Sequence, residues 1–302
     1  LRHLAQDLGE LAGGIILSGT GTDGTQGLRL IKEKAGVTVV QSPDSARHGG
    51  MPKSAIETGL VDYVLAPSEM PKRLIQYFKH PAAIQHKPED KDKKEPDPLR
   101  QILAFLANRT RHDFSQYKEN TVIRRIERRM TVTRSRSSSE YLKLLNRDRG
   151  EARSLFQDLL IGVTNFFRDP ETFDFLKKQV VPELISKKGR EGLRVWVPGC
   201  ATGEEAYSVA IILNECLEER DFLRGIQVFG TDIDPRAIEK ARQGTYVQNI
   251  VSDVSPERLK RYFTKENSRY RVKPDIRDQV LFAEQNILSD PPFSKLDLLV
   301  CR

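Results

Sequence analysis

The chain has 302 residues, of which 38% are hydrophobic and 30% are charged. This is enough for two or three ordinary hydrophobic cores and predicts a mixed α/β protein of the cytoplasm. No apolar run approaches the roughly 20 residues of a membrane span, and the first residues lack the apolar core of a signal peptide. Cys200, Cys216 and Cys301 are too few and too scattered for a disulfide framework or a zinc site, so we expect no metal.

The formal charge of +7 is concentrated in one stretch. Residues 99–150 hold thirteen Lys and Arg against five acids, a net charge of +8, which accounts for the whole excess. A basic face of this kind indicates an acidic partner, either nucleic acid or an acidic protein surface.

In chain order, residues 1–78 predict alternating strands and helices: GGIIL and VTVV as strands, TQGLRLIKEKAG and MPKSAIETG as helices. Residues 79–98 carry five Lys, five acids and four Pro, so we expect a charged, Pro-rich linker. Residues 99–190 have helical periodicity, with the arginines of TVIRRIERRM opposite the apolar face. Residues 191–302 alternate strand, turn and helix, which predicts a parallel, doubly wound sheet. The chain starts at Leu1 and stops after an apolar run, so we expect both ends to be cuts.

A first glycine-rich turn follows the first predicted strand. Gly19-Thr-Gly21-Thr-Asp-Gly24 matches G-x-G-x-x-G, and Asp44 follows 20 residues after Gly24. This pattern is typical of dinucleotide binding, but any tight crossover from strand to helix with a capping Asp favours the same residues. The pattern alone leaves both interpretations open.

The run from Ile15 to Leu65 resembles the C-terminal part of the catalytic domain of the chemoreceptor methylesterase family (CheB). The shared features are the strand, the G-x-G-x-D-G turn and the G-M-P-x-x-A run. The resemblance implies that Asp23 corresponds to the acid of a Ser-His-Asp triad whose Ser and His lie upstream. Ser18 lacks the context of a nucleophile, and we expect His48 in a surface loop. We therefore expect methylesterase activity only in an intact protein.

A second glycine-containing turn lies in RVWVPGCATGEE, where Gly199 and Gly203 separate a strand from a helix. Glycines let the backbone approach a ligand closely, and the start of the helix adds N–H donors. The turn has no phosphate-binding Lys and is followed by Glu204 and Glu205. This favours a cationic or hydroxyl-rich ligand such as S-adenosylmethionine, although capping of the helix dipole alone explains one of the acids.

Asp232 ends the next predicted strand, 28 residues after Glu204. In a doubly wound sheet, an acid at this point accepts hydrogen bonds from the ribose hydroxyls. Asp234 precedes Pro235 and is expected to cap the following helix, so Asp232 is the better ribose ligand. The two features together predict a class I (Rossmann-like) methyltransferase domain.

The segments VTNFFRDPETF, VWVPGCATGEEAYSVA, VFGTDIDPRAIEKARQGTY, NIL and LLVCR occur in this order between about Asp113 and Arg302. Together they resemble the CheR family of chemoreceptor glutamate O-methyltransferases. The resemblance implies that S-adenosylmethionine contacts Thr164, Arg168, Glu205, Asp232, Asn286, Ile287 and Arg302. Gly162 stands where the family often has Asn, a departure at one expected cofactor contact.

Methyl transfer to glutamate needs few catalytic groups. The side chain is already ionised at neutral pH, with a reference pKa near 4.3, so no general base is required. Catalysis is then mainly alignment of a carboxylate oxygen with the methyl group, and S-adenosylhomocysteine is the second product. Arg168 is our candidate for orienting a carboxylate, of either the substrate or methionine. A surface arginine in a helix-capping RDPET turn is the alternative.

The CheR resemblance also implies receptor contacts. It implies that Arg125, Arg128 and Arg129 dock on the cytoplasmic helical bundle of a chemoreceptor, whose methylated sites are rich in Glu. Residues 246–285 look like the small antiparallel β-subdomain of the family, which in some members grips a peptide at the receptor C-terminus. Here the turn KENSR is short and glycine-free, so tethering is not assumed.

The sequence also suggests two rival functions. Asp290-Pro-Pro-Phe293 resembles the D-P-P-[YF] signature of nucleic-acid methyltransferases, but it precedes the fourth strand instead of following it, so we expect a turn and no nucleic acid. The second rival is a non-enzymatic scaffold, because a truncated sheet with an open edge would bind no cofactor.

Overall fold

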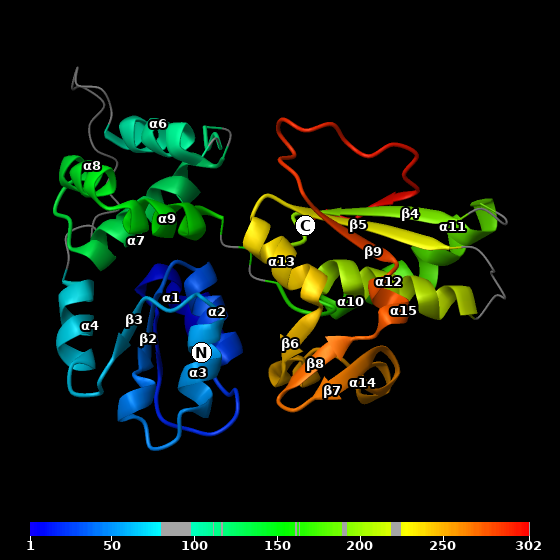
Figure 1. The fold of residues 1–302 in the computed structure, drawn as a ribbon, viewed down its shortest axis with the longest axis horizontal. Helices are drawn as coiled ribbons and strands as arrows, with labels where there is room; N and C mark the ends of the chain where they lie inside the picture. Colours follow the sequence, from blue (N-terminus) through cyan, green and yellow to red (C-terminus); the bar gives the residue numbers. More distant parts are fainter. Residues whose placement is uncertain are drawn as a thin grey trace. The chain divides into compact units, whose positions relative to one another are not determined.

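The structure is a computed structural model that describes residues 1–79, 98–110, 112–115, 117–160, 162, 164–188, 192–218 and 225–301. The chain divides into two units, residues 1–161 and 162–302 (Figure 1). Most of the predicted linker, residues 80–97, lies outside the described residues, as does Arg302. No helix in the described ranges is long and apolar enough to cross a membrane.

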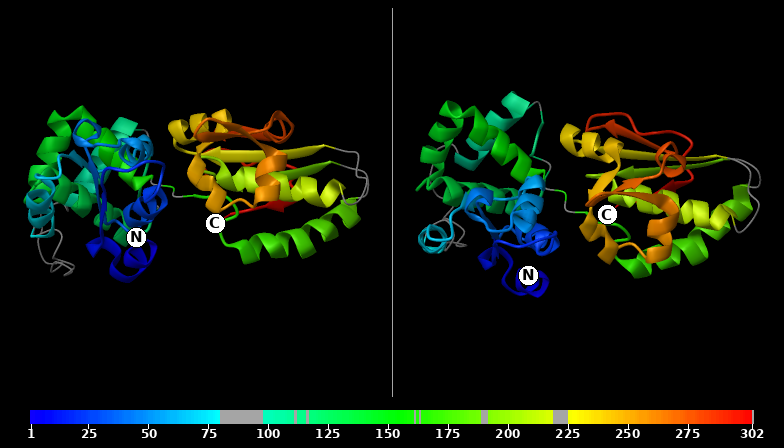
Figure 2. Two further views of the ribbon diagram at one scale, coloured as in Figure 1. Left: turned by 90° about the horizontal axis from the view of Figure 1, so that it is seen from below. Right: turned by 60° about the horizontal axis from the view of Figure 1, so that its bottom comes forward.

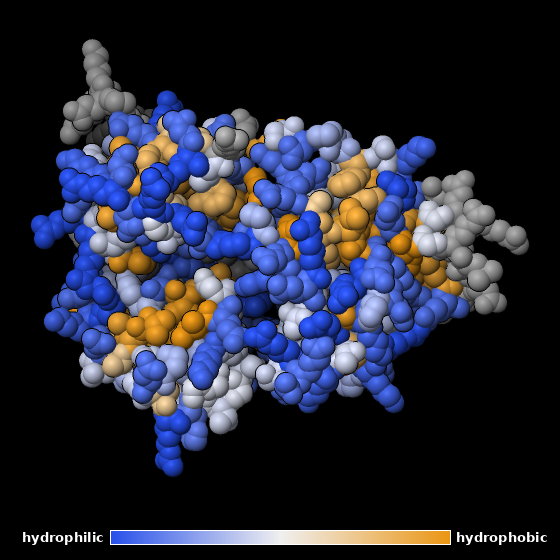
Figure 3. Space-filling model, in the orientation of Figure 1, coloured by the Kyte–Doolittle hydropathy of each residue, from blue (hydrophilic) through white to orange (hydrophobic). Residues whose placement is uncertain are grey.

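The first part of unit 1 is a parallel sheet in the order β1-β2-β3. Its strands are β1 (Gly13–Ile16), β2 (Val37–Gln41) and β3 (Tyr63–Leu65), and its helices are α1 (Arg2–Leu8), α2 (Thr25–Glu33), α3 (Gly50–Glu57) and α4 (Met70–Phe78). Every residue of β2 is buried because this strand is central. Ile15, Leu17 and Val64 are exposed. Other hydrophobic residues, orange in Figure 3, are also exposed on the face of the molecule drawn there.

The second part of unit 1 is helical, as the periodicity predicts. It contains α6 (Pro98–Thr110), α7 (Glu119–Thr133), α8 (Ser138–Arg147) and α9 (Arg149–Leu159). Ser137 caps α8 and Asp148 caps α9, each accepting hydrogen bonds from main-chain N–H groups of the first turn. The core between these helices includes Ile102, Leu106, Phe114, Val122, Ile126, Tyr141, Leu145 and Leu155.

Unit 2 is built on a parallel sheet in the order β10-β4-β5-β9, which confirms the predicted fold class. The strands are β4 (Leu193–Pro198), β5 (Ile226–Asp232), β9 (Val280–Glu284) and β10 (Leu298–Leu299). The helices are α10 (Pro170–Phe175), α11 (Val181–Lys188), α12 (Glu204–Glu218), α13 (Pro235–Gln243), α14 (Pro256–Tyr262) and α15 (Pro274–Arg277), with a π-helical turn at Leu176–Val180. Helix α12 lies against the sheet, and α11 lies against α12 (Figures 1 and 2).

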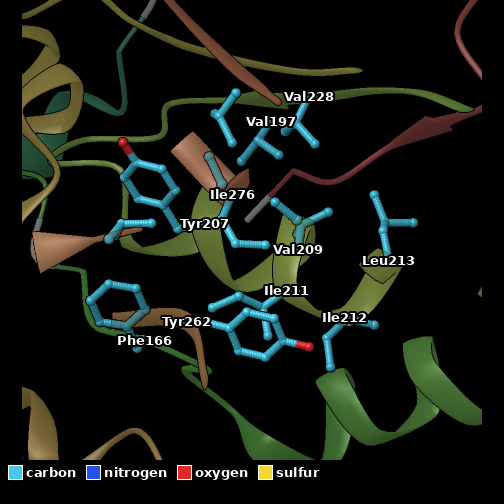
Figure 4. Close-up of a cluster of buried hydrophobic side chains, with 14 of the residues drawn as sticks. Phe166, Val197, Tyr207, Val209, Ile211, Ile212, Leu213, Val228, Tyr262 and Ile276 are labelled. Carbon is cyan, nitrogen blue, oxygen red and sulfur yellow. The ribbon is translucent and has the colours of Figure 1, made fainter. Parts of the chain in front are cut away.

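Helix α12 is the centre of the unit 2 core. Its residues from Ala206 to Leu213 are all buried, so the helix is apolar on every side. Val209 and Leu213 belong to the same cluster as Val197 and Val228 of the sheet, and Phe166 and Tyr262 also belong to that cluster (Figure 4).

A small antiparallel sheet, in the order β6-β8-β7, confirms the predicted β-subdomain. Its strands are β6 (Thr245–Val247), β7 (Phe263–Glu266) and β8 (Arg269–Val272). The predicted range of 246–285 is too long, because residues 280–284 pair with β5 in the parallel sheet as β9.

The predicted boundary between residues 190 and 191 is also misplaced. Phe166, Phe173, Val181 and Ile185 are buried in the core of unit 2, so residues 162–190 belong with the sheet. Helical periodicity identified these residues as helices but could not show which core they join.

Candidate cofactor site

The glycine turn after β4 has the backbone that its sequence predicts. Gly199, Ala201 and Gly203 all have positive φ angles, of 67°, 47° and 92°. A Cβ atom on Gly203 would lie 2.8 Å from the Cβ of Ala241 and 3.0 Å from the ring of Phe282, so only glycine fits there. Nothing lies within 4 Å of the Cβ position of Gly199, which leaves open space beside the turn.

Hydrogen bonds tie this turn to the neighbouring strand. The N–H of Cys200 donates to the carbonyl of Thr231 at 2.9 Å, and the N–H of Ala201 donates to the carboxylate of Asp232 at 2.8 Å. The Tyr246 hydroxyl donates to the carbonyl of Thr202 at 2.8 Å. These bonds hold the turn rigidly at the carboxyl edge of β4 and β5, where ligands bind in open α/β sheets.

Asp232 lies at the end of β5 with its carboxylate partly committed to the backbone. One oxygen accepts from Ala201, and the other accepts from the N–H of Asp234 at 2.9 Å. Each carboxylate oxygen has two acceptor sites, so these two bonds do not use the full acceptor capacity of the group. Burial raises the pKa of this carboxyl above its ordinary value even though the backbone hydrogen bonds favour the ionised form. Asp234 caps α13, as predicted.

The first turn of α12 carries the two glutamates. Glu204 is buried and its carboxylate accepts from the hydroxyl of Thr202 at 2.6 Å. This local bond gives Glu204 a structural role. Glu205 is only half-buried, so it remains the candidate for a cationic ligand group.

The segment with Thr164 and Arg168 is hydrogen-bonded to α12. Both residues are half-buried. Phe167 and Asp169 on either side of Arg168 have positive φ angles of 47° and 61°, an unusual backbone for such residues. The N–H of Phe167 donates to the hydroxyl of Ser208 at 3.0 Å, which fixes the turn that presents Arg168.

Two further contacts support this turn. The Arg258 guanidinium lies 4.1 Å from the centroid of the Phe167 ring and is held by Glu215 at 2.8 Å. At Gly162, a Cβ atom would lie 3.0 Å from the Cβ of Ala201. The departure from the expected Asn therefore coincides with a close approach of Gly162 to the glycine turn.

The NIL segment follows β9. The N–H of Gln285 donates to the carbonyl of Asp232 at 3.0 Å. The side-chain oxygen of Asn286 accepts from the N–H of Leu288 at 3.0 Å, and Ile287 is exposed. Asn286 and Ile287 thus lie just past the same edge of the sheet as Asp232.

The structure therefore brings the predicted cofactor residues of the glycine turn, β5 and the NIL segment to one edge, and links the Arg168 turn to α12. Ser208, Tyr246 and Arg258 support this arrangement but were missed by sequence reasoning, because their partners are 41, 44 and 91 residues away. The site suits a nucleoside with free hydroxyls and a cationic group, because it combines the Asp232 carboxyl, a half-buried Glu and a glycine turn with open space beside it. These features define a nucleoside-binding domain of the Rossmann-like class.

Asp23 lies exposed in the turn between β1 and α2. The hydroxyl of Ser18 accepts from the N–H of His48 at 2.9 Å, so this pair is joined through the main chain of His48. His48 is exposed, as predicted. Within the described ranges no group of three or more His, Cys, Asp or Glu could hold a metal ion.

The DPPF motif packs on the sheet. The ring of Phe293 stacks on Phe229, with centroids 4.4 Å apart, and meets Trp196 edge-on at 5.5 Å. Asp290 accepts from the N–H of Asn286 at 2.7 Å. Both residues have structural roles in the turn before β10, which agrees with the interpretation of this motif as a turn.

The three α7 arginines that were expected to dock on a receptor lie largely inside unit 1. Arg125 and Arg128 are only 6% and 4% exposed, and Arg129 pairs with Glu151. Arg125 donates to the carbonyls of Lys32 and Glu33, and Arg128 pairs with Asp62 and Asp158. These guanidinium groups therefore all have partners inside unit 1, and their docking on a receptor stays a prediction.

Three family models match consecutive parts of the chain. CheB methylesterase matches residues 1–74, the all-alpha domain of CheR methyltransferase matches residues 97–160, and its SAM binding domain matches residues 162–302. The nucleoside-binding domain is therefore an S-adenosylmethionine-binding methyltransferase domain, and S-adenosylmethionine is its cofactor.

Similar proteins agree with these matches. Chemotaxis protein methyltransferase 1 of Pseudomonas aeruginosa is 33% identical over 191 residues, covering 61% of this chain and 70% of that protein. The chemotaxis protein methyltransferase of Listeria innocua is 29% identical over 190 residues, covering 63% and 71%. The chain belongs to the chemotaxis protein methyltransferase (CheR) family, and a CheB methylesterase segment precedes its CheR domains.

An uncharacterized 104.1 kDa protein of Rhodobacter capsulatus is 37% identical over 321 residues. The match covers 99% of this chain but 34% of that protein, so the chain spans about a third of this relative's length. The crystal structure of the Thermotoga maritima CheB catalytic domain is 37% identical, covers 24% of this chain and 38% of that chain, and superposes with a TM-score of 0.23.

Proposed function

We propose that this chain methylates glutamate side chains on the cytoplasmic helical bundle of chemoreceptors, and so acts in the cytoplasm in chemotaxis adaptation. The observation that carries the proposal is the assembly of Asp232, the glycine turn and the NIL segment at one sheet edge in a CheR-family chain. Asp23 of the CheB segment corresponds to the acid of the esterase triad, and we expect methylesterase activity only in an intact protein that also carries the Ser and His of that triad.

The cofactor residues have distinct roles in this proposal. Asp232 accepts hydrogen bonds from the ribose hydroxyls, and Glu205 faces the cationic amino group. Gly199 and Gly203 let the main chain approach the cofactor closely. Thr164, Asn286, Ile287 and Arg302 complete the contacts. S-adenosylmethionine, when bound, supplies an electrophilic methyl group on a sulfonium.

Arg168 orients the substrate carboxylate or that of methionine. Charge-assisted hydrogen bonds from a guanidinium fix a carboxylate in one plane, and the Phe167–Asp169 backbone holds this side chain in place. A carboxylate oxygen of the receptor glutamate attacks the methyl carbon, the bond from carbon to sulfur breaks, and the methyl ester and S-adenosylhomocysteine are released. No proton moves, because the carboxylate is ionised at neutral pH.

The test is transfer of a labelled methyl group to a purified receptor cytoplasmic fragment. We expect Arg168→Ala and Asp232→Ala to lose most of the activity, while Arg261→Ala, at an exposed ion pair on α14, keeps it. Full activity in both site variants contradicts the site assignment. Calorimetry with S-adenosylhomocysteine separates the enzyme from a scaffold, because a scaffold binds none.

A further inference from the structure

Four charged side chains form a buried cluster inside unit 1. Lys32 and Asp62 come from the CheB segment, and Arg128 and Asp158 come from the CheR helices. Their side chains are only 4%, 0%, 2% and 8% exposed, in that order. Charges are rarely buried this deeply unless they are paired, so the cluster marks a specific contact.

The charges alternate across the contact. Lys32 Nζ lies 2.7 Å from Asp62 Oδ1 in its own segment and 3.3 Å from Asp158 Oδ1 of α9. Arg128 pairs with Asp158 of its own domain and with Asp62 of the CheB segment. Each cation therefore lies between one acid from each side. Buried pairs of this kind fix an orientation more than they add stability.

Arg125 adds a second link of different chemistry. Its guanidinium donates to the carbonyls of Lys32 at 3.1 Å and Glu33 at 3.0 Å, the last two residues of α2. Arg128 Nε also donates to the carbonyl of Gly36 at 3.3 Å. The last carbonyls of a helix carry partial negative charge, so a buried cation beside them is favourable.

The contact continues along α7 beyond the arginines. The hydroxyl of Tyr63 donates to the carbonyl of Val132 at 3.2 Å. The Val132 side chain packs against the CheB cluster that contains Val37, Val39, Met70 and Tyr77. Arg134 donates to the side-chain oxygen of Gln76 at 3.0 Å. One face of α7, from residue 125 to 134, is therefore covered by the CheB segment.

We propose that this face of α7 is the docking surface for the CheB segment of the same chain, and that the docked segment excludes an acidic external partner from Arg125 and Arg128. The two sides match separate families, so the contact belongs to their fusion and not to either family alone. The Rhodobacter capsulatus relative aligns across both sides. Two measurements test this proposal. Receptor binding rests on the proposed function, whereas hydrogen exchange tests the docking independently of it.

The most informative variant is Arg125→Met in the full chain. Methionine keeps the apolar stem and removes the bonds to the α2 carbonyls together with one buried positive charge, while the two cations and two acids of the cluster keep their own ion pairs. We expect amide hydrogen exchange at residues 31–41 and 125–133 to become about tenfold faster, because hydrogen bonds from a charged group are lost. Arg136→Met changes an exposed arginine beyond α7 and is expected to leave this exchange unchanged.

The receptor arm measures binding of the cytoplasmic receptor fragment to the same variants. We expect Arg125→Met to bind as the parent does or more tightly, because Arg125 is occupied inside the chain. Unchanged exchange in Arg125→Met overturns the docking, and weaker receptor binding by this variant overturns the exclusion of the receptor from Arg125. If the parent chain does not bind receptor, the proposed function fails while the exchange result still decides the docking.

Asp62→Asn removes the acid that both cations share and provides a second variant. We expect faster exchange in α7 as well as in β2, even though the substituted residue belongs to the CheB segment. Asp44→Asn, at an exposed acid of the same segment, is the matched control. Faster exchange confined to the CheB segment in Asp62→Asn contradicts the docking.

Discussion

Replacing Asp232 by Asn tests the cofactor site with a change of one charge and almost no change of shape. Both carboxylate oxygens already accept a main-chain N–H, from Ala201 at 2.8 Å and from Asp234 at 2.9 Å. An amide has one oxygen, so one N–H loses its acceptor, and a ribose hydroxyl meets a neutral group. Hydrogen bonds to a charged group contribute about 1.5–3 kcal/mol, so we expect about 10- to 100-fold weaker cofactor binding.

The assay is calorimetric titration with S-adenosylhomocysteine, with circular dichroism to show that the variant is folded. Asp234→Asn is the matched control, because Asn caps a helix about as well as Asp and the cap of α13 is kept. We expect the control to change the dissociation constant by less than about threefold. A folded Asp232→Asn protein within that range, or an equal loss in the control, refutes the role given to Asp232.

Three further predictions follow from contacts in the two units. Gly203→Ala is expected to lower the free energy of unfolding by about 1–3 kcal/mol, because Gly203 has a φ of 92° and lies close to Ala241. The measurement is thermal unfolding, and Gly225→Ala, with open space around it, is the control. Ser208→Ala removes the acceptor of the Phe167 N–H, so we expect methyl-transfer kinetics to show a reduced kcat with the cofactor dissociation constant little changed; an unchanged kcat contradicts the positioning of Arg168 by this bond. Burial favours a raised pKa for the Asp62 carboxyl, but Arg128 and Lys32 hold that pKa below its ordinary value. The ionised carboxylate therefore stabilises the folded chain above about pH 4, and this contribution to the free energy of unfolding is lost as the pH falls further. Chemical unfolding of the full chain from pH 6 downward is expected to show this loss in the parent and a flatter profile in Asp62→Asn, and equal slopes contradict it.

The parts of the fold that depend on short stretches of sequence could be predicted. The glycine turn, the acid at the end of β5 and the cap of α13 each lie within a few residues of the element they serve, so pattern and spacing identified them. The small antiparallel sheet was also predicted, although its end was placed too late. Residues 280–284 have the alternation of a strand, and alternation does not show which sheet a strand joins.

The supporting contacts of the cofactor site could not be predicted in this way. Ser208 and Arg258 act on Phe167 from 41 and 91 residues away. Nothing in the sequence around a serine of an apolar helix indicates that its hydroxyl accepts a hydrogen bond from a distant N–H. Such contacts depend on packing between elements, which one sequence does not specify by spacing.

The arginines of α7 show why amphipathic patterning misleads at a contact between domains. Periodicity assigns every charged residue of a helix to solvent, yet a planar guanidinium tolerates burial where carboxylates and carbonyls meet it. The partners carry the signal in the sequence: Asp62 and Asp158 each stand among apolar residues, in LVDYVL and LFQDLL, and Lys32 directly follows Leu30 and Ile31. A charge inside an apolar run predicts a buried partner of opposite sign. Two acids and one cation of this kind in one unit therefore predict a charged internal contact, and that contact leaves less of the basic excess of residues 99–150 for an external partner.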